Sequence, residues 1–200
     1  MQFDAQAAPA EIVKIGHPAL RLGTRMVPQD LFDAPPLYEL IDVMRATLAG
    51  KGVGLAAPQI AVPLRLFVIE DTEDRMIHLS PEQRRHLHRT PYPFEAIINP
   101  VWRATSSRVV IEQEGCLSVP GLKADVPRYW SIEAEGFGPD GKRKSWSVEG
   151  WPARIFQHEI DHLDGRLITD RMLPWTLAST APPALGTPSA LLRRLGLSDI

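Results

Sequence analysis

Two histidines four residues apart stand late in the chain, in the run His158-Glu159-Ile160-Asp161-His162. In an α-helix, residues at this spacing lie on one face about 6 Å apart, so their imidazoles can bind one metal ion. Glu159 follows the first histidine, where its carboxylate can accept a proton from a water that the metal activates. The motif therefore predicts metal-dependent hydrolytic chemistry.

The motif leaves open which residue supplies a third protein ligand. A catalytic metal usually has three protein ligands and one open position. In the metzincin pattern a third histidine falls six residues after the second, but this chain has Ile168 there, and neither Glu nor His occurs after His162. The third ligand is therefore expected upstream. The candidates are His17, the clustered His78, His86 and His88, and Cys116, the only thiol of the chain.

An amphipathic helix and a glycine-rich stretch come first among the elements that must position these groups. Apolar residues recur at helical spacing from Pro36 to Gly50, which predicts a helix. Residues 51–59 are too rich in glycine and small side chains for a regular element, so we expect a loop that leads into a strand over 64–70. Residues 71–94 are polar and predict a surface insertion with a short helix that starts at Ser80.

Strand-like runs cluster in the middle of the chain, and the histidine-bearing helix follows them. Strands are expected over 95–101, 108–113, 129–137 and 144–148, the last two joined as a hairpin. Pro152 and Gly165 delimit the late helix, because proline suits a first turn and glycine a C-terminal cap. The order predicts an α+β domain in which antiparallel-rich mixed sheets wrap around a central metal-bearing helix.

Composition suits one compact domain and argues against several classes of protein. The 200 residues carry a formal net charge of −2 and one cysteine, which disfavours direct nucleic-acid binding and rules out an internal disulfide. No run approaches the roughly 18 apolar residues that a membrane-spanning helix needs, and no export or import signal is recognised. We expect a catalytic domain over 1–173 and a Pro/Ala-rich tail over 174–200, with a short helix over 189–197.

Three stretches, taken in chain order, resemble the motifs of peptide deformylases. They are GVGLAAPQ at 52–59, EGCLS at 114–118 and QHEIDHLDG at 157–165. The resemblance covers most of the chain, and the stretches at 69–72 and 150–154 are similar to the type I subclass shared by bacteria and organelles. It implies that Cys116, His158 and His162 hold the metal. It also implies that Glu159 is the acid/base residue.

The same resemblance implies a substrate and the groups that bind it. The substrate would be N-formylmethionine at the start of newly made polypeptides, and hydrolysis would release formate. The side-chain amide of Gln59 and the backbone N–H of Leu117 would stabilise the oxyanion, while Gly54 would contact the peptide. An apolar pocket would read the methionine side chain. Its expected lining includes Val53, Trp151 and Ile155, for which core packing is the alternative.

The cofactor implied by the resemblance is one divalent ion, Fe(II), with Zn(II), Ni(II) or Co(II) able to replace it. The expected location is the cytoplasm of a bacterium, with an organelle as the alternative. The C-terminal helix suggests a transient contact with the ribosome. The sequence leaves open whether the protein is a monomer or a dimer.

Two other functions remain open from the residues alone. A metallopeptidase would use the same histidine pair to cleave internal peptide bonds. A structural metal protein would instead close the site with a fourth ligand, for which Glu114 and His17 are the candidates. For the nearby cations Arg154 and Lys123, we expect solvated charges in preference to substrate contacts.

Overall fold

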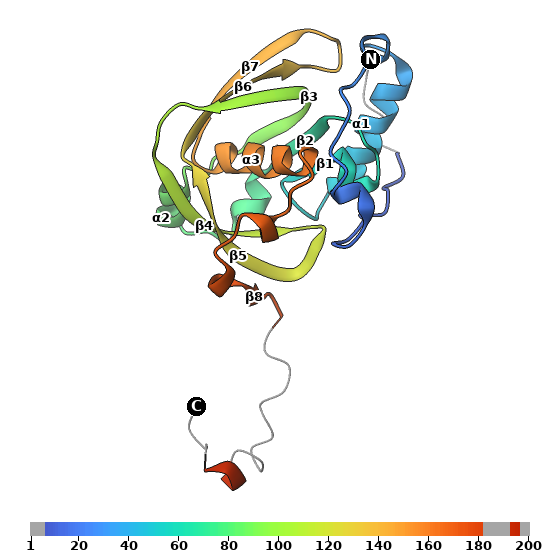
Figure 1. Ribbon diagram of the computed structural model, residues 1–200. Helices are drawn as coiled ribbons and strands as arrows, with labels where there is room; N and C mark the ends of the chain where they lie inside the picture. The colour runs from blue at the N-terminus through green and yellow to red at the C-terminus, as the bar shows by residue number, and fades with distance from the viewer. Residues whose placement is uncertain (1–6, 182–192, 197–200) are drawn as a thin grey trace.

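The computed structural model describes residues 7–181 and 193–196. Two antiparallel sheets curve around the helix α3 (Trp151–Leu163), as Figure 1 shows. The larger sheet has the strand order β1-β2-β3-β6-β7, and the smaller has the order β4-β5-β8. This arrangement confirms the predicted α+β fold around a central helix. The strands are β1 (Gly54–Ala56), β2 (Leu66–Asp71), β3 (Tyr92–Ala104), β4 (Val109–Cys116), β5 (Val119–Tyr129), β6 (Ser131–Phe137), β7 (Arg143–Glu149) and β8 (Ala178–Ser179).

Helix α3 begins and ends where the sequence predicts. Gly150 precedes it with φ +63°, and Gly165 follows it with φ +74°; glycine adopts such left-handed conformations at little cost. Phe156, Ile160 and Leu163 are at most 1% exposed. The helix therefore buries one face in the core, as predicted, and this burial fixes the direction of the opposite face.

The larger sheet packs between α3 and α1 (Pro35–Leu48). Successive side chains of β2 alternate between the two layers, since Leu66 and Val68 join the cluster under α1 while Phe67 and Ile69 join the cluster under α3. Such alternation follows from the two-residue period of a strand. Both faces of β2 are therefore buried, which anchors α3 to the rigid centre of the fold.

The glycine-rich stretch contains more regular structure than predicted. Residues 54–56 form β1, which pairs antiparallel with β2, and a short 3-10 helix follows over Ala57–Ile60. The prediction of a loop without regular elements was wrong. Small side chains disfavour a strand by propensity, but here they fit a completely buried position at the edge of the sheet.

The β4–β5 hairpin is the second correction. The strand expected over 129–137 forms as β6 from Ser131, but residues 119–129 form β5, where no strand was expected. Pro120 and Pro127 argue against a strand because proline cannot donate to a ladder. Only Leu122 and Lys123 of β5 pair with β8. The prolines therefore lie where β5 is an edge strand and the missing donors are tolerated.

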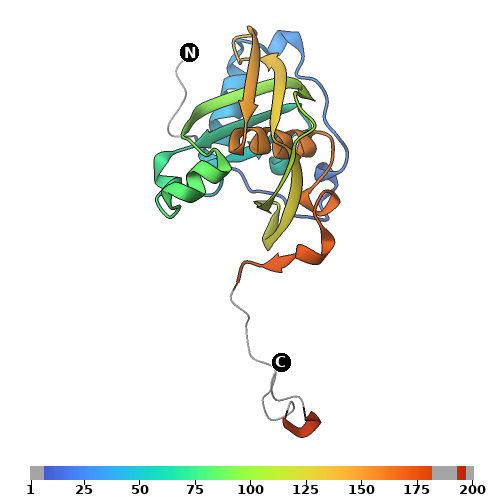
Figure 2. The same ribbon diagram turned by 90° about the vertical axis from the view of Figure 1, so that its left-hand side faces the viewer.

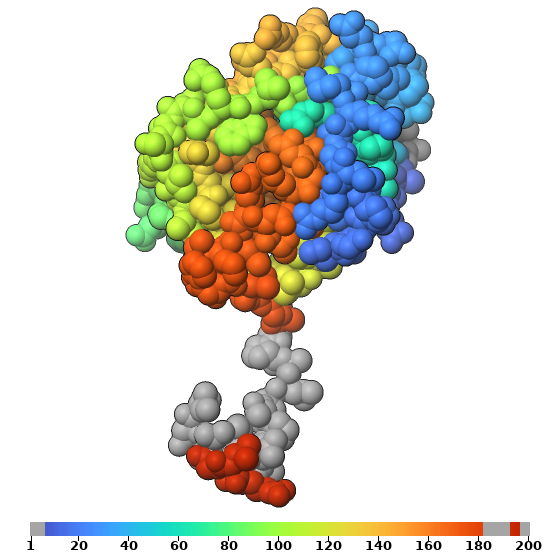
Figure 3. Space-filling model, in the orientation of Figure 1, coloured from blue at the N-terminus to red at the C-terminus, as the bar shows by residue number. Residues whose placement is uncertain are grey.

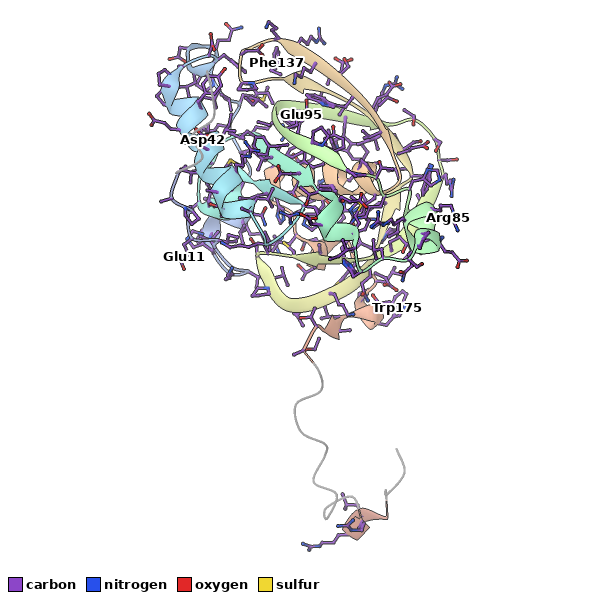
Figure 4. The ribbon with its side chains drawn as sticks, turned by 180° about the vertical axis from the view of Figure 1, so that it is seen from behind. Glu11, Asp42, Arg85, Glu95, Phe137 and Trp175 are labelled. Carbon is purple, nitrogen blue, oxygen red and sulfur yellow. The ribbon has the colours of Figure 1, made fainter. Side chains whose placement is uncertain are left out.

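The insertion forms a 3-10 turn at Glu73–Met76 and the predicted short helix α2 (Pro81–Leu87). Ser80 caps α2, and its Oγ accepts a hydrogen bond of 3.1 Å from the backbone N–H of Gln83. Helix α2 lies at the side of the fold in Figure 2. Figure 4 shows Arg85 on this helix pointing away from the body. The prediction of a surface insertion is confirmed.

The N-terminal segment and residues 174–181 lie against the domain. Figure 3 shows the N-terminal segment, in blue, against the orange segment that includes the end of α3. Thr24 Oγ1 donates there to the carbonyl of Leu163, the last residue of α3, at 2.9 Å. At the other end, Trp175 is on the surface (Figure 4), and the backbone N–H of Thr180 donates to the carbonyl of Gly121 at 2.9 Å. Most of the helix predicted over 189–197 lies outside the described residues, and the domain boundary at 173 stays a prediction.

Within the described part of the chain, the longest helices are too short or too polar to cross a membrane.

Candidate metal centre and active site

The end of β4 brings Cys116 to the two histidines of α3. The thiol sulfur and one ring nitrogen of each histidine all lie within 4.8 Å of one another, and Cys116 Sγ is 3.3 Å from His162 Nε2. A thiolate and two neutral imidazoles form a donor set that binds divalent transition metals. The three side chains therefore fit a metal ion with an open coordination position.

The other histidines that the sequence left open as ligands lie elsewhere. His17 is exposed, and its Nδ1 accepts the backbone N–H of Ala19 at 3.2 Å. His86 and His88 contact the carboxylates of Glu112 and Glu149 at the surface. Among the residues that the structure describes, Cys116, His158 and His162 are the one group of this kind.

Behind His158, a buried carboxylate orients the imidazole. Glu114 Oε2 is 2.8 Å from His158 Nδ1, which leaves Nε2 for the metal position. Two guanidinium groups hold Glu114 in turn: Arg128 through Nε and Nη2 at 2.9 and 3.0 Å, and Arg154 through Nη1 at 2.7 Å. Glu114 is therefore engaged behind the ligand, which argues against its role as a fourth ligand.

Arg154 contradicts the expectation of a solvated charge. Its side chain is buried, and besides Glu114 it donates to the backbone carbonyls of Val110 and Val126, both at 2.8 Å. Arg128 also pairs with Asp161 on α3. Asp161 belongs to the histidine motif, but nothing in the sequence pattern marked Arg128 as a neighbour of the site, because the two meet only when β5 packs on the helix.

Burial and pairing shift the proton affinities of the site. Burial opposes the charged form of Glu114, but hydrogen bonds from His158 and Arg128 hold its pKa well below the ordinary value. Burial, with the nearby His158 and Arg128, lowers the pKa of His162 well below its usual value, so this ring is neutral and ready to bind a metal. Burial also raises the pKa of Glu159 to about 7. Glu159 can therefore both accept and release a proton near neutral pH.

Glu159 lies against the glycine-rich stretch. A Cβ placed on Gly54 would be 2.3 Å from Glu159 Oε1, much closer than any van der Waals contact. The carboxylate is 3% exposed, and its Oε2 has no hydrogen-bond partner within the described chain. Gly54 thus makes room for the acid/base candidate, a function that the sequence reasoning did not foresee.

Gln59 lies beside the sulfur and not on the surface. Its side chain is 1% exposed. Its Oε1 accepts the backbone N–H of Ala56 at 2.8 Å, and its Nε2 donates to Ser118 Oγ at 3.2 Å and contacts Cys116 Sγ at 3.9 Å. Its amide therefore borders the position where a substrate carbonyl would meet the metal.

A pocket of about 890 Å³ opens onto these groups. Most of its surface is apolar, and residues of β1 and β4 line it. Trp151 packs on the guanidinium of Arg89 at 4.7 Å from the ring centre, and Asp71 binds that guanidinium. Every residue that we expected in substrate binding lines the pocket, namely Val53, Gly54, Trp151 and Ile155. Leu117 also lines it.

Comparison with known proteins shows the family to which the chain is similar. Residues 9–177 match the model of a family described as polypeptide deformylase. The chain is 40% identical over 167 residues to peptide deformylase 1A of Arabidopsis thaliana, covering 83% of this chain and 62% of that protein. It is 41% identical over 182 residues to peptide deformylase 1 of Streptomyces coelicolor, covering 90% and 81%.

Solved structures share the fold. A class I type b peptide deformylase from Acinetobacter baumannii with Met-Ala-Ser bound superposes with a TM-score of 0.74 at 29% identity, covering 84% of this chain and all of that one. The deformylase of Thermotoga maritima gives a TM-score of 0.69 at 31% identity, covering 83% and 99%. The similarity thus spans both sheets and the central helix.

Proposed function

The chain belongs to the polypeptide deformylase family, and from this premise we propose that it removes the N-formyl group from N-formylmethionine of newly made polypeptides. The reaction adds water across the formamide C–N bond and yields formate and a free amino terminus. One observation carries the proposal: a Cys-His-His cluster and a buried glutamate with a pKa of about 7 meet at an apolar pocket. The relatives named above are peptide deformylases of a plant and of bacteria.

Cys116, His158 and His162 would hold one divalent ion. Bound there, the ion supplies Lewis acidity, which makes water a better nucleophile and polarises the formyl carbonyl. Fe(II) is the proposed ion, because a thiolate with two imidazoles accepts it and the resemblance to the family implies it. Zn(II), Ni(II) and Co(II) suit the same donors.

Glu159 would act as the general base and then the general acid of the reaction. Its carboxylate accepts a proton from the attacking water and then delivers it to the departing amine nitrogen. A pKa of about 7 suits both steps at neutral pH. The amide of Gln59 and the backbone N–H of Leu117 would donate to the carbonyl oxygen as it becomes negative.

The peptide would enter as an extended strand between β1 and β4. Both strands are at the edge of their sheets and both line the pocket, so backbone groups along their pocket edges can pair with a peptide. Gly54 would contact the peptide backbone, and Val53, Trp151 and Ile155 would pack on the methionine side chain. The Acinetobacter deformylase was solved with Met-Ala-Ser, which begins with the same residue.

We place the enzyme where synthesis starts with formylmethionine, the cytoplasm of a bacterium, with an organelle as the alternative. Relatives of the chain are bacterial, chloroplast and mitochondrial deformylases. Residues 1–173 would form the catalytic domain. Residues 174–200 would form a tail that gives a transient contact with the ribosome.

Formate release from a short N-formyl-methionyl peptide tests the proposal. Protein prepared without oxygen and loaded with Fe(II) or Ni(II) should release formate, and Glu159→Ala should lose almost all activity while retaining its metal. A second substrate, an unformylated peptide, tests the metallopeptidase alternative. Cleavage of its internal bonds without formate release from the first peptide would overturn the assignment.

A further inference from the structure

The carboxamide of Gln59 is held at both ends by protein groups. The oxygen accepts the N–H of Ala56, and one N–H of the nitrogen goes to the hydroxyl of Ser118. The terminal torsion of a glutamine is broad and nearly two-fold, so packing alone would not orient this amide. The hydrogen bonds decide which atom faces the reacting carbonyl.

We propose that Ser118 is a positioning residue for deformylation, which holds the amide of Gln59 so that its second N–H is aimed at the oxyanion. This inference rests on the proposed function. A donor contributes to catalysis only when it already points to where charge develops. Ser118 supplies that orientation without touching the substrate, because Ser118 is absent from the pocket lining and completely buried.

Burial makes the hydroxyl hard to replace. Ser118 is 0% exposed and lies outside the pocket lining, so bulk water does not reach the position of its hydroxyl. Without the hydroxyl, one N–H of Gln59 would be left without an acceptor in the protein interior. The amide would then rotate toward another acceptor, such as the sulfur of Cys116 at 3.9 Å.

The N-terminal segment fixes the backbones of both partners. The N–H of Val13 donates to the carbonyl of Gln59, and the N–H of Ile15 donates to the carbonyl of Ser118, each at 2.8 Å. Between them, Lys14 Nζ donates to the carbonyl of Leu117 at 3.2 Å. Three consecutive residues thus connect the two motifs that would supply the oxyanion donors. The spacing between Gln59 and Ser118 is set before a substrate arrives.

The first test is Ser118→Ala in the full chain, loaded with Ni(II) and assayed by formate release. We expect kcat to fall about 10-fold, which corresponds to the energy of one lost hydrogen bond. KM and metal content should be unchanged. Thr176→Ala is the matched control, since Thr176 Oγ1 also accepts a hydrogen bond, from the N–H of Asp125 at 2.9 Å, but lies outside the pocket. This control should keep the wild-type kcat.

A double-mutant cycle separates positioning from a purely structural role. If Ser118 acts through Gln59, then Ser118→Ala should have no further effect on kcat in a Gln59→Ala background. Ser118→Thr, which keeps the hydroxyl, should recover most of kcat and covers the case in which the alanine variant does not fold. A 10-fold loss that persists without the Gln59 side chain, or a normal kcat in folded Ser118→Ala, would overturn the inference. Wild-type protein that releases no formate would instead overturn the proposed function.

Discussion

The two sides of the site hold their side chains by different means. On the helix side, the imidazole of His158 contacts the carboxylate of Glu114. Arg128 and Arg154 both form buried ion pairs with that carboxylate. On the loop side, Gln59 and Ser118 are held by neutral amide and hydroxyl hydrogen bonds. Buried charges depend strongly on each partner being present. We therefore expect the helix side to determine the stability and its pH dependence. We expect the loop side to determine the orientation of the Gln59 amide.

Glu114→Gln should cause the largest loss of stability, because it removes the carboxylate charge that Arg128 and Arg154 share. Breaking a buried ion pair by removing one partner costs about 3–5 kcal/mol of unfolding free energy. Urea unfolding of the apoprotein measures it. Glu112→Gln, two residues away on β4 and paired with the exposed His86, should cost less than about 1 kcal/mol. Equal losses in the two variants would mean that burial of the Glu114 charge is not what gives the helix side its stability.

Gly54→Ala, on the loop side of the site, should lower the rate of formate release with little effect on stability. The added Cβ would overlap the carboxylate of Glu159, which must then move from its place. Misplacement of a catalytic group by about 1 Å costs about 100-fold in rate. Formate release measures the loss. Gly115→Ala is the matched control, because its Cβ would have the carbonyl of Leu122 as nearest neighbour at 3.8 Å, and a similar loss in that variant would contradict the explanation.

Low pH should reduce the stability that the helix side contributes and leave the neutral hydrogen bonds of the loop side unchanged. The pKa of Glu114 is depressed in the folded protein, so its contribution to stability is complete above its unfolded pKa, about 4.3. That contribution is lost as the pH falls from there toward the folded value, with a slope of about 1.4 kcal/mol per pH unit for one proton. Urea midpoints of the apoprotein between pH 7 and 3 measure this slope. Glu114→Gln should show a shallower acid limb than the wild type, and parallel limbs would exclude Glu114 as the source.

Arg143→Ala should cause the smallest loss of stability and gives a reference value for an exposed ion pair. Arg143 pairs with Glu135 at 2.6 Å on the β6–β7 hairpin, but both side chains are more than half exposed. Such exposed pairs contribute less than about 1 kcal/mol, and salt screens them. Thermal unfolding at low and high salt is the measurement. A loss as large as that of Glu114→Gln would mean that burial does not explain the difference between ion pairs in this protein.

Periodicity and motif spacing predicted the elements that carry the chemistry. The helix of the two histidines has a clear apolar face and clear end signals, and it forms where expected. The hairpin partner β5 was not recognised, because its prolines, glycine and aspartate are turn formers by propensity. Pairing along β4 outweighs that local preference. The same holds for β1, whose small residues become a strand only because β2 and α3 bury them.

The sequence by itself determined which groups are available: two histidines on one helical face, a glutamate between them, one thiol and a glutamine after a glycine-rich stretch. These follow from residue types and from the helical period, which are local properties. Only the tertiary structure decided that Cys116 meets the histidines and that Glu114 stands behind His158. It also decided that Gly54 makes room for Glu159. Those contacts join segments far apart in the chain, and their geometry is set by how the sheets pack on α3.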